Sequence, residues 1–280
     1  MANFKFSAFA DEAGKMLTEQ IDAMRGNGIG YLEMRGVNGT NVADLTPADA
    51  RAIRAELDAA EIAVWSLGSP IGKIKLADPF APELDRFKRL LETADITGAK
   101  RIRMFSFYEA EGEGAFDAVC ERIDRYLDAA KGSGVILCHE NEKGIYGDIA
   151  SRCAELHKAL PALRAVFDPA NFVQCGQDTA EAWEMLAPYI DYMHIKDARF
   201  SDGLVVPPGA GDGQLAHLLG KYAAQGGEVL TLEPHLKVFK GLDALENGER
   251  PKVPEGMFAT GREAFDFAVT ALRGVIATLD

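Results

Sequence analysis

Short apolar runs alternate with amphipathic segments along the whole chain, and this alternation constrains the fold more than any other feature of the sequence. The apolar runs have the length of strands, and the amphipathic segments repeat their apolar residues at helical spacing. Strands that alternate with helices form parallel sheets, because each helix returns the chain to the start of the next strand. Eight such units follow one another, with expected strands at 4–8, 31–35, 63–67, 101–107, 135–139, 165–168, 192–196 and 229–233.

Eight strand–helix units predict an α/β fold, a closed (β/α)₈ barrel. Such a barrel takes about 250 residues as one unit, and this chain has 280. We therefore expect a single domain over 1–280. Hydrophobic residues make up 48% of the chain and charged residues 26%, so the composition supplies the core that a globular barrel needs.

Capping residues mark several of the expected helices. Ile53 and Leu57 recur at helical spacing, and Thr46 and Pro47 supply an N-cap and a first-turn proline before them. Asp178 can cap a later helix in the same way. His157 and His217 lie in helical patterns, and we expect both of them at the surface.

Two connections are longer than the others, 198–214 after the seventh strand and 234–260 after the eighth. Loops of that length in a compact domain are usually lids, binding loops or disordered inserts. Both follow strands, at the face where the active sites of barrels lie. We expect a lid, formed by the insert 234–260, and a contact between subunits of a homo-oligomer is the alternative.

Charge and segment composition argue against several classes of protein. The net charge of −13 repels the phosphate backbone of nucleic acid. The first residues lack the features of a signal peptide, and no apolar run has the length of a membrane span. The four cysteines form no C-x-x-C pair, which indicates neither disulfides nor a thiolate zinc site. We expect a cytoplasmic protein that binds a small molecule, with no nucleic-acid or membrane partner.

Four side chains that can bind a metal stand at the ends of the last four strands: Glu140, Asp168, His194 and Glu233. The carboxyl ends of barrel strands converge on one mouth, so these four should lie close together. Three carboxylates and an imidazole suit one divalent ion such as Mn²⁺, Mg²⁺, Co²⁺ or Zn²⁺. Taken singly, each residue has a structural interpretation. Glu140 could be a charged strand end and Asp168 a turn residue. His194 could be a core histidine and Glu233 a solvent-facing carboxylate. Their shared position in consecutive units favours a metal site.

Seven segments of the chain carry a resemblance to a known group of barrels. They are FADE at 9–12, YLEMR at 31–35, HENE at 139–142, FDPAN at 167–171, HIKD at 194–197, GAGDG at 209–213 and LEPH at 232–235. With them, nearly the whole chain resembles the xylose-isomerase-like TIM barrels, the sugar phosphate isomerases/epimerases. This group also includes an inosose dehydratase and AP endonucleases of the endonuclease IV type.

The resemblance implies that Glu140, Asp168, His194 and Glu233 bind the metal ion and that the two glutamates also act as acid and base. The implied activity is isomerisation or epimerisation of a sugar, a sugar phosphate or a keto-polyol. An ion that binds a carbonyl and the adjacent hydroxyl stabilises an enediolate, and a glutamate on each face of the substrate can then move a proton.

Arg35, Arg103 and Lys196 are candidates for binding the substrate. The two arginines stand near the expected mouth, where a guanidinium can bind a carboxylate or phosphate. A buried ion pair of Arg35 with Glu33 or Asp11 is the alternative. Lys196 shares the strand parity of His194 and should point inward, and the alternative is a surface pair with its neighbour at position 197.

Glu142, Asn171 and His235 are further candidates, since each follows an expected metal ligand closely and can bond a hydroxyl of the substrate. Ketose 3-epimerases in the group that this chain resembles usually place a histidine three residues after the aspartate ligand. The chain has Asn171 there, which weakens an assignment to 3-epimerisation in particular.

Three other functions share part of this pattern. The same enolate can expel a β-hydroxyl, which would make the protein a metal-dependent dehydratase or lyase of a keto-sugar or keto-inositol. A non-catalytic sugar-binding subunit would use the same barrel, although no expected ligand is lost. A DNA-repair endonuclease needs more histidines after strands three and four, where this chain has Gly68-Ser69 and Ser106-Phe107.

Overall fold

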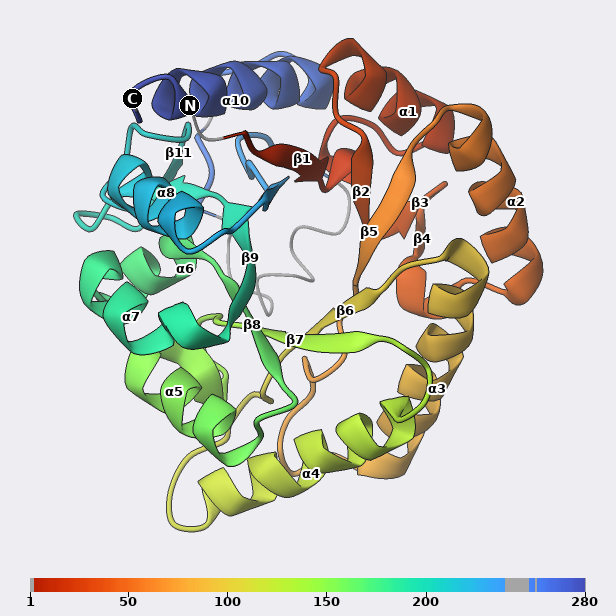
Figure 1. The fold of residues 1–280 in the computed structure, drawn as a ribbon, viewed down its shortest axis with the longest axis vertical. Coiled ribbons are helices and arrows are strands. Elements are labelled where there is room, and N and C mark those ends of the chain that lie inside the picture. Colours follow the sequence, from red (N-terminus) through yellow and green to blue (C-terminus); the bar gives the residue numbers. More distant parts are fainter. Residues whose placement is uncertain (1–2, 240–251, 255, 280) are drawn as a thin grey trace.

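The structure, a computed structural model, describes residues 3–239, 252–254 and 256–279. Figure 1 shows a barrel of strands surrounded by a ring of helices. The barrel is closed in the order β1-β12-β9-β8-β7-β6-β5-β2, and every neighbouring pair is parallel. The predicted (β/α)₈ barrel is thereby confirmed. Its strands are β1 (Lys5–Ala8), β2 (Tyr31–Met34), β5 (Ala63–Gly68), β6 (Arg101–Met104), β7 (Ile136–Glu140), β8 (Arg164–Phe167), β9 (Ile190–Ile195) and β12 (Val229–Leu232).

Helices follow the strands and cover the outside of the barrel (Figure 1). As predicted, Thr46 caps α2 by accepting the N–H of Asp49, and the side chain of Asp178 accepts the N–H of Glu181 at the start of α7. Such caps are worth about 1 kcal/mol each. The helices are α1 (Leu17–Gly26), α2 (Pro47–Ala59), α3 (Phe80–Thr97), α4 (Ala115–Ala130), α5 (Ala150–Ala159), α6 (Pro169–Gln174), α7 (Thr179–Leu186), α8 (Leu215–Ala224) and α10 (Gly261–Ile276), with 3-10 turns η1 (Ala10–Glu12), η2 (Val42–Asp44), η3 (Tyr146–Asp148) and η4 (Ala187–Tyr189).

Most of the predicted strands end within one or two residues of the observed ones, and the strand expected at 101–107 is the exception. β6 ends at Met104, and the chain then turns. Phe107 adopts a φ of +68°, and its N–H donates to the carbonyl of Gly72 instead of continuing the barrel. The apolar run continues past the strand because Phe105 and Phe107 are fully buried although they lie outside it.

The prediction of a surface position for His157 is wrong. The residue is 1% exposed, near the end of α5. Its Nδ1 lies 3.2 Å from the carbonyl oxygen of Leu163, and its ring stacks on Tyr189 with 5.2 Å between the ring centroids. The helical pattern predicted the helix correctly but did not reveal that this face packs inward.

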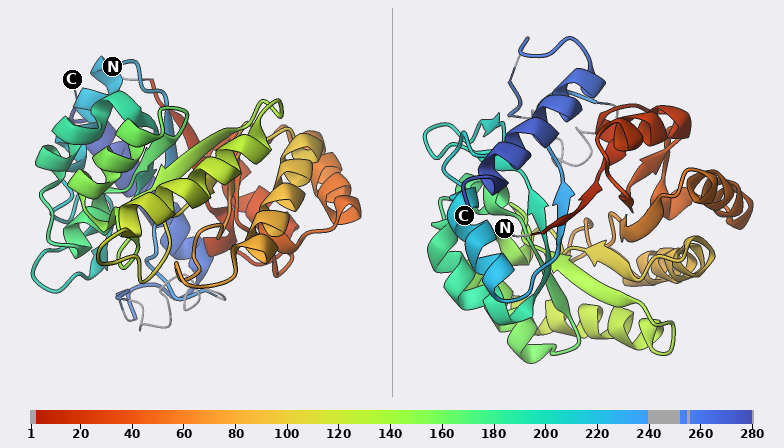
Figure 2. Two further views of the ribbon diagram at one scale, coloured as in Figure 1. Left: turned by 90° about the horizontal axis from the view of Figure 1, so that it is seen from below. Right: turned by 45° about the horizontal axis from the view of Figure 1, so that its top comes forward.

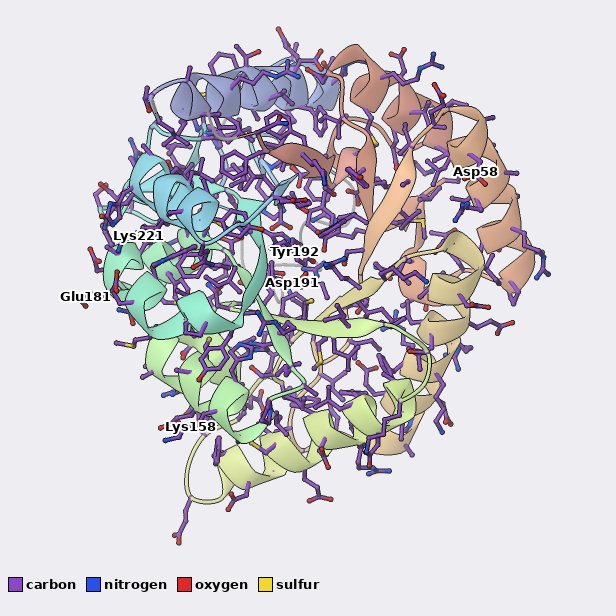
Figure 3. All side chains as sticks on the ribbon, viewed as in Figure 1. Asp58, Lys158, Glu181, Asp191, Tyr192 and Lys221 are labelled. Atoms are coloured by element: carbon purple, nitrogen blue, oxygen red, sulfur yellow. The ribbon has the colours of Figure 1, made fainter. Side chains whose placement is uncertain are left out.

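The interior of the barrel has an apolar cluster below the charged residues of its mouth. Cys138, Val166 and Tyr192 form a buried cluster within it, against the partly buried Trp65. Figure 3 shows Tyr192 near the centre of the barrel. Since strand residues two apart point to the same side, Glu140 and His194 point inward above this cluster, toward the carboxyl ends of the strands.

The long connection after β9 forms a two-stranded ribbon of β10 (Asp197–Ala198) and β11 (Val205–Val206). The carboxylate of Asp197 then accepts the backbone N–H groups of Gly209, Gly211 and Gly213, at 2.9, 3.0 and 2.9 Å. This loop is therefore held by its own residues.

The lid predicted at 234–260 lies partly outside the described residues, which omit 240–251 and 255. In the described part, Lys237 Nζ donates to the carbonyl of Phe258 at 2.7 Å, and Val205 N–H donates to the carbonyl of Lys252 at 2.9 Å. Figure 2 shows that this side of the barrel is opposite the one where the chain ends lie.

A second ribbon, β3 (Gly36–Val37) with β4 (Thr40–Asn41), follows β2. None of the described helices is both long and apolar enough to cross a membrane.

Candidate metal centre

The structure brings Glu140, Asp168, His194 and Glu233 together at the carboxyl ends of four adjacent strands. One potential ligand atom from each lies within 4.8 Å of those of the others, and all four residues are buried. Glu140 is the last residue of β7 and His194 lies in β9, whereas Asp168 and Glu233 directly follow β8 and β12. Their positions thus follow from the barrel itself and not from a flexible loop.

Each of the two glutamates divides its oxygens between an arginine and His194. Arg103 Nη1 donates to Glu140 Oε2 at 2.7 Å, and Arg35 Nη1 donates to Glu233 Oε1 at 2.9 Å. The other oxygens, Oε1 of Glu140 and Oε2 of Glu233, lie 3.0 and 3.3 Å from His194 Nδ1. Both carboxylates therefore present one oxygen to the centre of the cluster.

Asp168 is held at one oxygen and has no aligned donor at the other. Its Oδ1 accepts the N–H of Asn171 at 2.9 Å, which caps α6. Its Oδ2 lies 3.0 Å from Lys196 Nζ, yet no hydrogen bond to it has acceptable geometry. A buried carboxylate oxygen in this position is suited to a cation.

Lys196 lies inside the site, also 3.4 Å from Glu233 Oε2. The alternative of a surface pair between Lys196 and Asp197 is wrong, since both residues are buried and the Asp197 carboxylate binds backbone N–H groups.

His194 is fixed at both ring nitrogens. Its Nε2 lies 3.2 Å from Glu33 Oε2, and its Nδ1 faces the two glutamates. Burial would lower the pKa of His194, but the carboxylates of Glu140 and Glu33 raise it well above its usual value. The Nδ1 atom is thus the imidazole nitrogen directed at the candidate metal position.

The carboxyl groups of the site differ in their pKa. Burial raises the pKa of Glu140, but His194 and Arg103 outweigh it and bring the value down to about 2. Burial also raises the pKa of Glu233, but the positive charge of Lys196, followed by His235, outweighs it and holds that pKa well below its usual range. For Asp168, burial prevails over Lys196 and raises the pKa to about 6. Both glutamates are therefore carboxylates at neutral pH, the form that binds cations.

Arg35 binds three carboxylates at once. It donates to Asp11 through Nε and Nη2, each at 3.0 Å. Its Nη2 also lies 3.1 Å from Glu12 Oε1, and its Nη1 makes the contact with Glu233. Of the two alternatives weighed for it, the pair with Asp11 is present and the one with Glu33 is not. Sequence reasoning missed Asp11 and Glu12 as site residues, although the segment 9–12 was one of those that carried the resemblance.

A second group of possible ligands, Glu12, Glu233 and His235, lies beside the first. The backbone N–H of His235 donates to Glu12 Oε2 at 2.7 Å, and its Nε2 lies 3.4 and 3.5 Å from the Oε1 atoms of Glu12 and Glu233. The guanidinium of Arg35 already binds both of those Oε1 atoms. A cation placed there would face a positive charge, so the geometry favours a single ion, in the first group.

The remaining candidates for substrate binding lie around the cluster. Asn171 Nδ2 donates to the carbonyl of Asn141 at 2.9 Å and to Glu140 Oε1 at 3.3 Å. Glu142 is turned to Lys73, with 3.1 Å between Oε2 and Nζ, and does not touch the four ligand candidates. Lys73 also lies over the ring of Phe105.

A cavity of about 540 Å³ adjoins the cluster. None of the four ligand candidates lines it, but Arg35, which binds Glu233, does, and so does Glu12. The wall carries charges of both signs. A cavity of this size accepts a small molecule. Its other charged or polar lining residues include Asp11, Lys15, Asn41 and Lys73.

The chain is similar to a known protein family and to several solved structures. A family model described as "Xylose isomerase-like TIM barrel" matches residues 21–247, and no curated protein matches the chain. An L-ribulose 3-epimerase structure is 15% identical, with a TM-score of 0.75 and coverage of 100% of this chain and 96% of that one. The IOLI protein with a zinc atom is 16% identical, with a TM-score of 0.75 and 99% coverage of both chains. The probable 3-DHS dehydratase AsbF from Bacillus anthracis is 14% identical, with a TM-score of 0.74 and coverage of 97% and 98%.

Proposed function

Since the chain belongs to the xylose isomerase-like TIM barrel family, we propose that it is an enzyme that isomerises or epimerises a small sugar-like substrate with one divalent metal ion. The observation that carries the proposal is the paired arrangement of Glu140 and Glu233. Each offers one oxygen to the centre of the cluster while an arginine holds the other. The fold neighbours named as epimerases support the same class of reaction.

The donor set fits a divalent ion. The ion would be held by oxygen atoms of Glu140, Asp168 and Glu233 and by Nδ1 of His194. This set of donors suits Mn²⁺, Mg²⁺, Co²⁺ or Zn²⁺. Oδ2 of Asp168 supports this assignment, because it is buried and accepts no hydrogen bond of acceptable geometry. When bound, the ion supplies Lewis-acid polarisation of a carbonyl and its neighbouring hydroxyl.

Glu140 and Glu233 are the proposed acid and base. Glu140 ends β7 and Glu233 directly follows β12, strands separated by β8 and β9 in the barrel, so the two carboxylates approach a ligand from different directions. One carboxylate removes a C–H proton and the other returns a proton. Return to the opposite face of the same carbon inverts that centre, and return to the neighbouring carbon isomerises the substrate.

The substrate would lie in the cavity beside the cluster. Its lining of carboxylates, lysines and an amide suits a molecule rich in hydroxyl groups, with or without a phosphate. Arg35 lines this cavity, whereas Asn171, Lys196 and His235 contact Glu140, Asp168 and Glu233 of the cluster. These four residues remain the proposed substrate contacts, together with Arg103 and Glu142.

An exchange experiment tests this function. The metal-loaded protein is incubated in deuterated water with a panel of ketoses, keto-inositols and keto-acids, and the recovered compounds are examined for deuterium. We expect exchange with one class of substrate and its loss on chelation of the metal. Glu140→Gln and Glu233→Gln should each lower the rate by about 10²- to 10⁴-fold, the usual contribution of a general acid or base.

Glu83→Gln is the matched control, since Glu83 is a buried carboxylate in α3 that binds the N–H of Gly72 away from the cluster. Full exchange in either Glu140→Gln or Glu233→Gln would reject the two-glutamate mechanism.

Dehydration is the second candidate, and the similarity of the fold to a probable dehydratase is the observation that favours it. It begins with the same proton abstraction, but a β-hydroxyl then leaves. A dehydrated product in the panel would identify the protein as a lyase. Absence of exchange and of product with every compound would instead favour a sugar-binding subunit.

A further inference from the structure

Glu33 is a buried carboxylate whose only ion pair, among the described residues, is with His194. It lies in β2 and is 0% exposed. Its Oε2 lies 3.2 Å from His194 Nε2, and its Oε1 accepts a hydrogen bond from the hydroxyl of Tyr192 at 2.7 Å. Both oxygens are therefore engaged by side chains of β9, although Glu33 belongs to a strand that is not a neighbour of β9 in the barrel.

Three strands hold this arrangement rigid. Tyr192 and His194 are two residues apart in β9, so both point into the barrel. Glu33 and Ser66 are partners in the register of β2 and β5, and Ser66 Oγ lies 3.2 Å from the Tyr192 hydroxyl. The ring of Tyr192, seen at the barrel centre in Figure 3, also meets Trp65 edge-on at 6.0 Å between centroids. The Glu33 carboxylate thus has little freedom to turn.

The hydrogen bonds determine which ring nitrogen of His194 carries a proton toward Glu33. A carboxylate only accepts hydrogen bonds, so Nε2 must be the donor. The same rule makes Nδ1 a donor to Glu140 Oε1, 3.0 Å away. A cation bound between Glu140 and Glu233 would take the place of that proton, and the lone pair of Nδ1 would then face the ion while the proton on Nε2 stays with Glu33. Metal-binding histidines commonly gain their orientation and basicity from a carboxylate on the other nitrogen.

We propose that Glu33, held by Tyr192 and Ser66, is a positioning residue that fixes His194 with Nδ1 directed at the metal ion. This inference rests on the metal site of the proposed function, but not on any particular reaction.

The affinity for Cd²⁺, measured by calorimetry, tests the role of Glu33. Glu33→Gln keeps the shape of the side chain but turns an acceptor into a group that can donate to Nε2, which favours the tautomer with its proton on Nδ1. We expect Cd²⁺ binding about 10- to 100-fold weaker than in the unaltered protein. Glu83→Gln, which also removes a buried carboxylate, should bind Cd²⁺ as the unaltered protein does.

Tyr192→Phe separates orientation from charge, because it removes the donor to Glu33 and leaves every charge in place. We expect Cd²⁺ binding to weaken by about 2- to 10-fold, the effect of one hydrogen bond, and to weaken no further when Tyr192→Phe is added to Glu33→Gln. Tyr126→Phe is the control, since the Tyr126 hydroxyl is buried without a hydrogen-bond partner in the described structure. This variant should bind Cd²⁺ normally.

Nitrogen-15 spectra of the protein loaded with ¹¹³Cd provide a direct signature, and the chain has only five histidines to assign. We expect cadmium coupling to Nδ1 of His194 and a proton on Nε2. Coupling to Nε2, or unweakened cadmium binding in Glu33→Gln, would overturn the role of Glu33 and leave the metal site standing. Failure of the unaltered protein to bind any divalent ion would overturn both the positioning role and the proposed function.

Discussion

Two histidines outside the candidate metal centre, His139 and His157, are buried against each other with 5.8 Å between their ring centroids. Burial is the main reason that the pKa of His139 falls to about 3 and that of His157 to about 4. For His157, the carbonyl of Leu163 partly opposes that shift. Both rings are thus neutral at physiological pH, and protonating either one requires a charge in the core.

His157 should make the protein sensitive to acid. Its pKa is about 4 in the folded state and about 6.5 in the unfolded chain. Between these values the unfolded chain binds more protons, so the free energy of unfolding falls as pH is lowered from about 6.5 to 4, by up to about 1.4 kcal/mol per pH unit. In His157→Gln, urea unfolding at a series of pH values should show a shallower decline.

His217→Gln is the control for this measurement, because His217 is exposed on α8. Its unfolding should follow the same pH dependence as the unaltered protein. If His157→Gln loses stability in acid as steeply as His217→Gln does, His157 is not the group responsible.

At the scale of elements, the loop at 209–213 is organised by a single carboxylate, that of Asp197. Three backbone N–H groups converge on it. A Cβ added at Gly211 would come within 2.4 Å of Asp197 Oδ1, and Gly209 has a φ of +86° that favours glycine. The glycines therefore allow the backbone to approach Asp197, which directly follows Lys196 of the candidate site.

Asp197→Asn should loosen this loop. An amide nitrogen would face donors that now bind a carboxylate oxygen, and each lost charged hydrogen bond is worth about 1.5 kcal/mol or more. We expect hydrogen exchange at 209–213, followed by mass spectrometry, to accelerate by about tenfold or more. Asp202→Asn, at an exposed ion pair with Arg199 in the same connection, should leave this exchange unchanged. Equal exchange in the two variants would argue against the role of Asp197.

The sequence predicted the elements well because their signals are local. Apolar runs predicted all eight barrel strands, and residues such as Thr46 and Asp178 marked helix starts through contacts three residues away. The metal-ligand candidates could also be predicted, since each one is tied to a strand end. The contacts of Glu33 could not be predicted, because they reach across the barrel to a strand far along the chain. Tyr192, for example, is 159 residues from Glu33 in sequence.

At the scale of the whole molecule, the candidate metal centre joins distant parts of the chain. The contact between Arg35 and Glu233 spans 198 positions in sequence, and the four ligand candidates come from β7, β8, β9 and β12 or the residues directly after them. A bound ion would therefore link four adjacent strands of the barrel, and unfolding would have to release it.

Metal binding should accordingly stabilise the entire barrel. A ligand that binds only the folded state adds about 2.7 kcal/mol at 100 times its Kd. We expect Mn²⁺ to raise the thermal unfolding temperature and a chelator to reverse the shift. Asp168→Asn should bind Mn²⁺ more weakly and show a smaller shift, whereas Asp202→Asn should show the full one. An identical shift in Asp168→Asn would mean that the ion binds elsewhere.

The apolar cluster of Cys138, Val166 and Tyr192 lies beneath the charged residues of the barrel mouth. Since the interior of such a barrel is filled by side chains and is not a pore, a molecule that reaches the charged residues would enter and leave at the carboxyl ends of the strands. If the proposed reaction takes place there, substrate and product would occupy the same position, and the product should inhibit competitively.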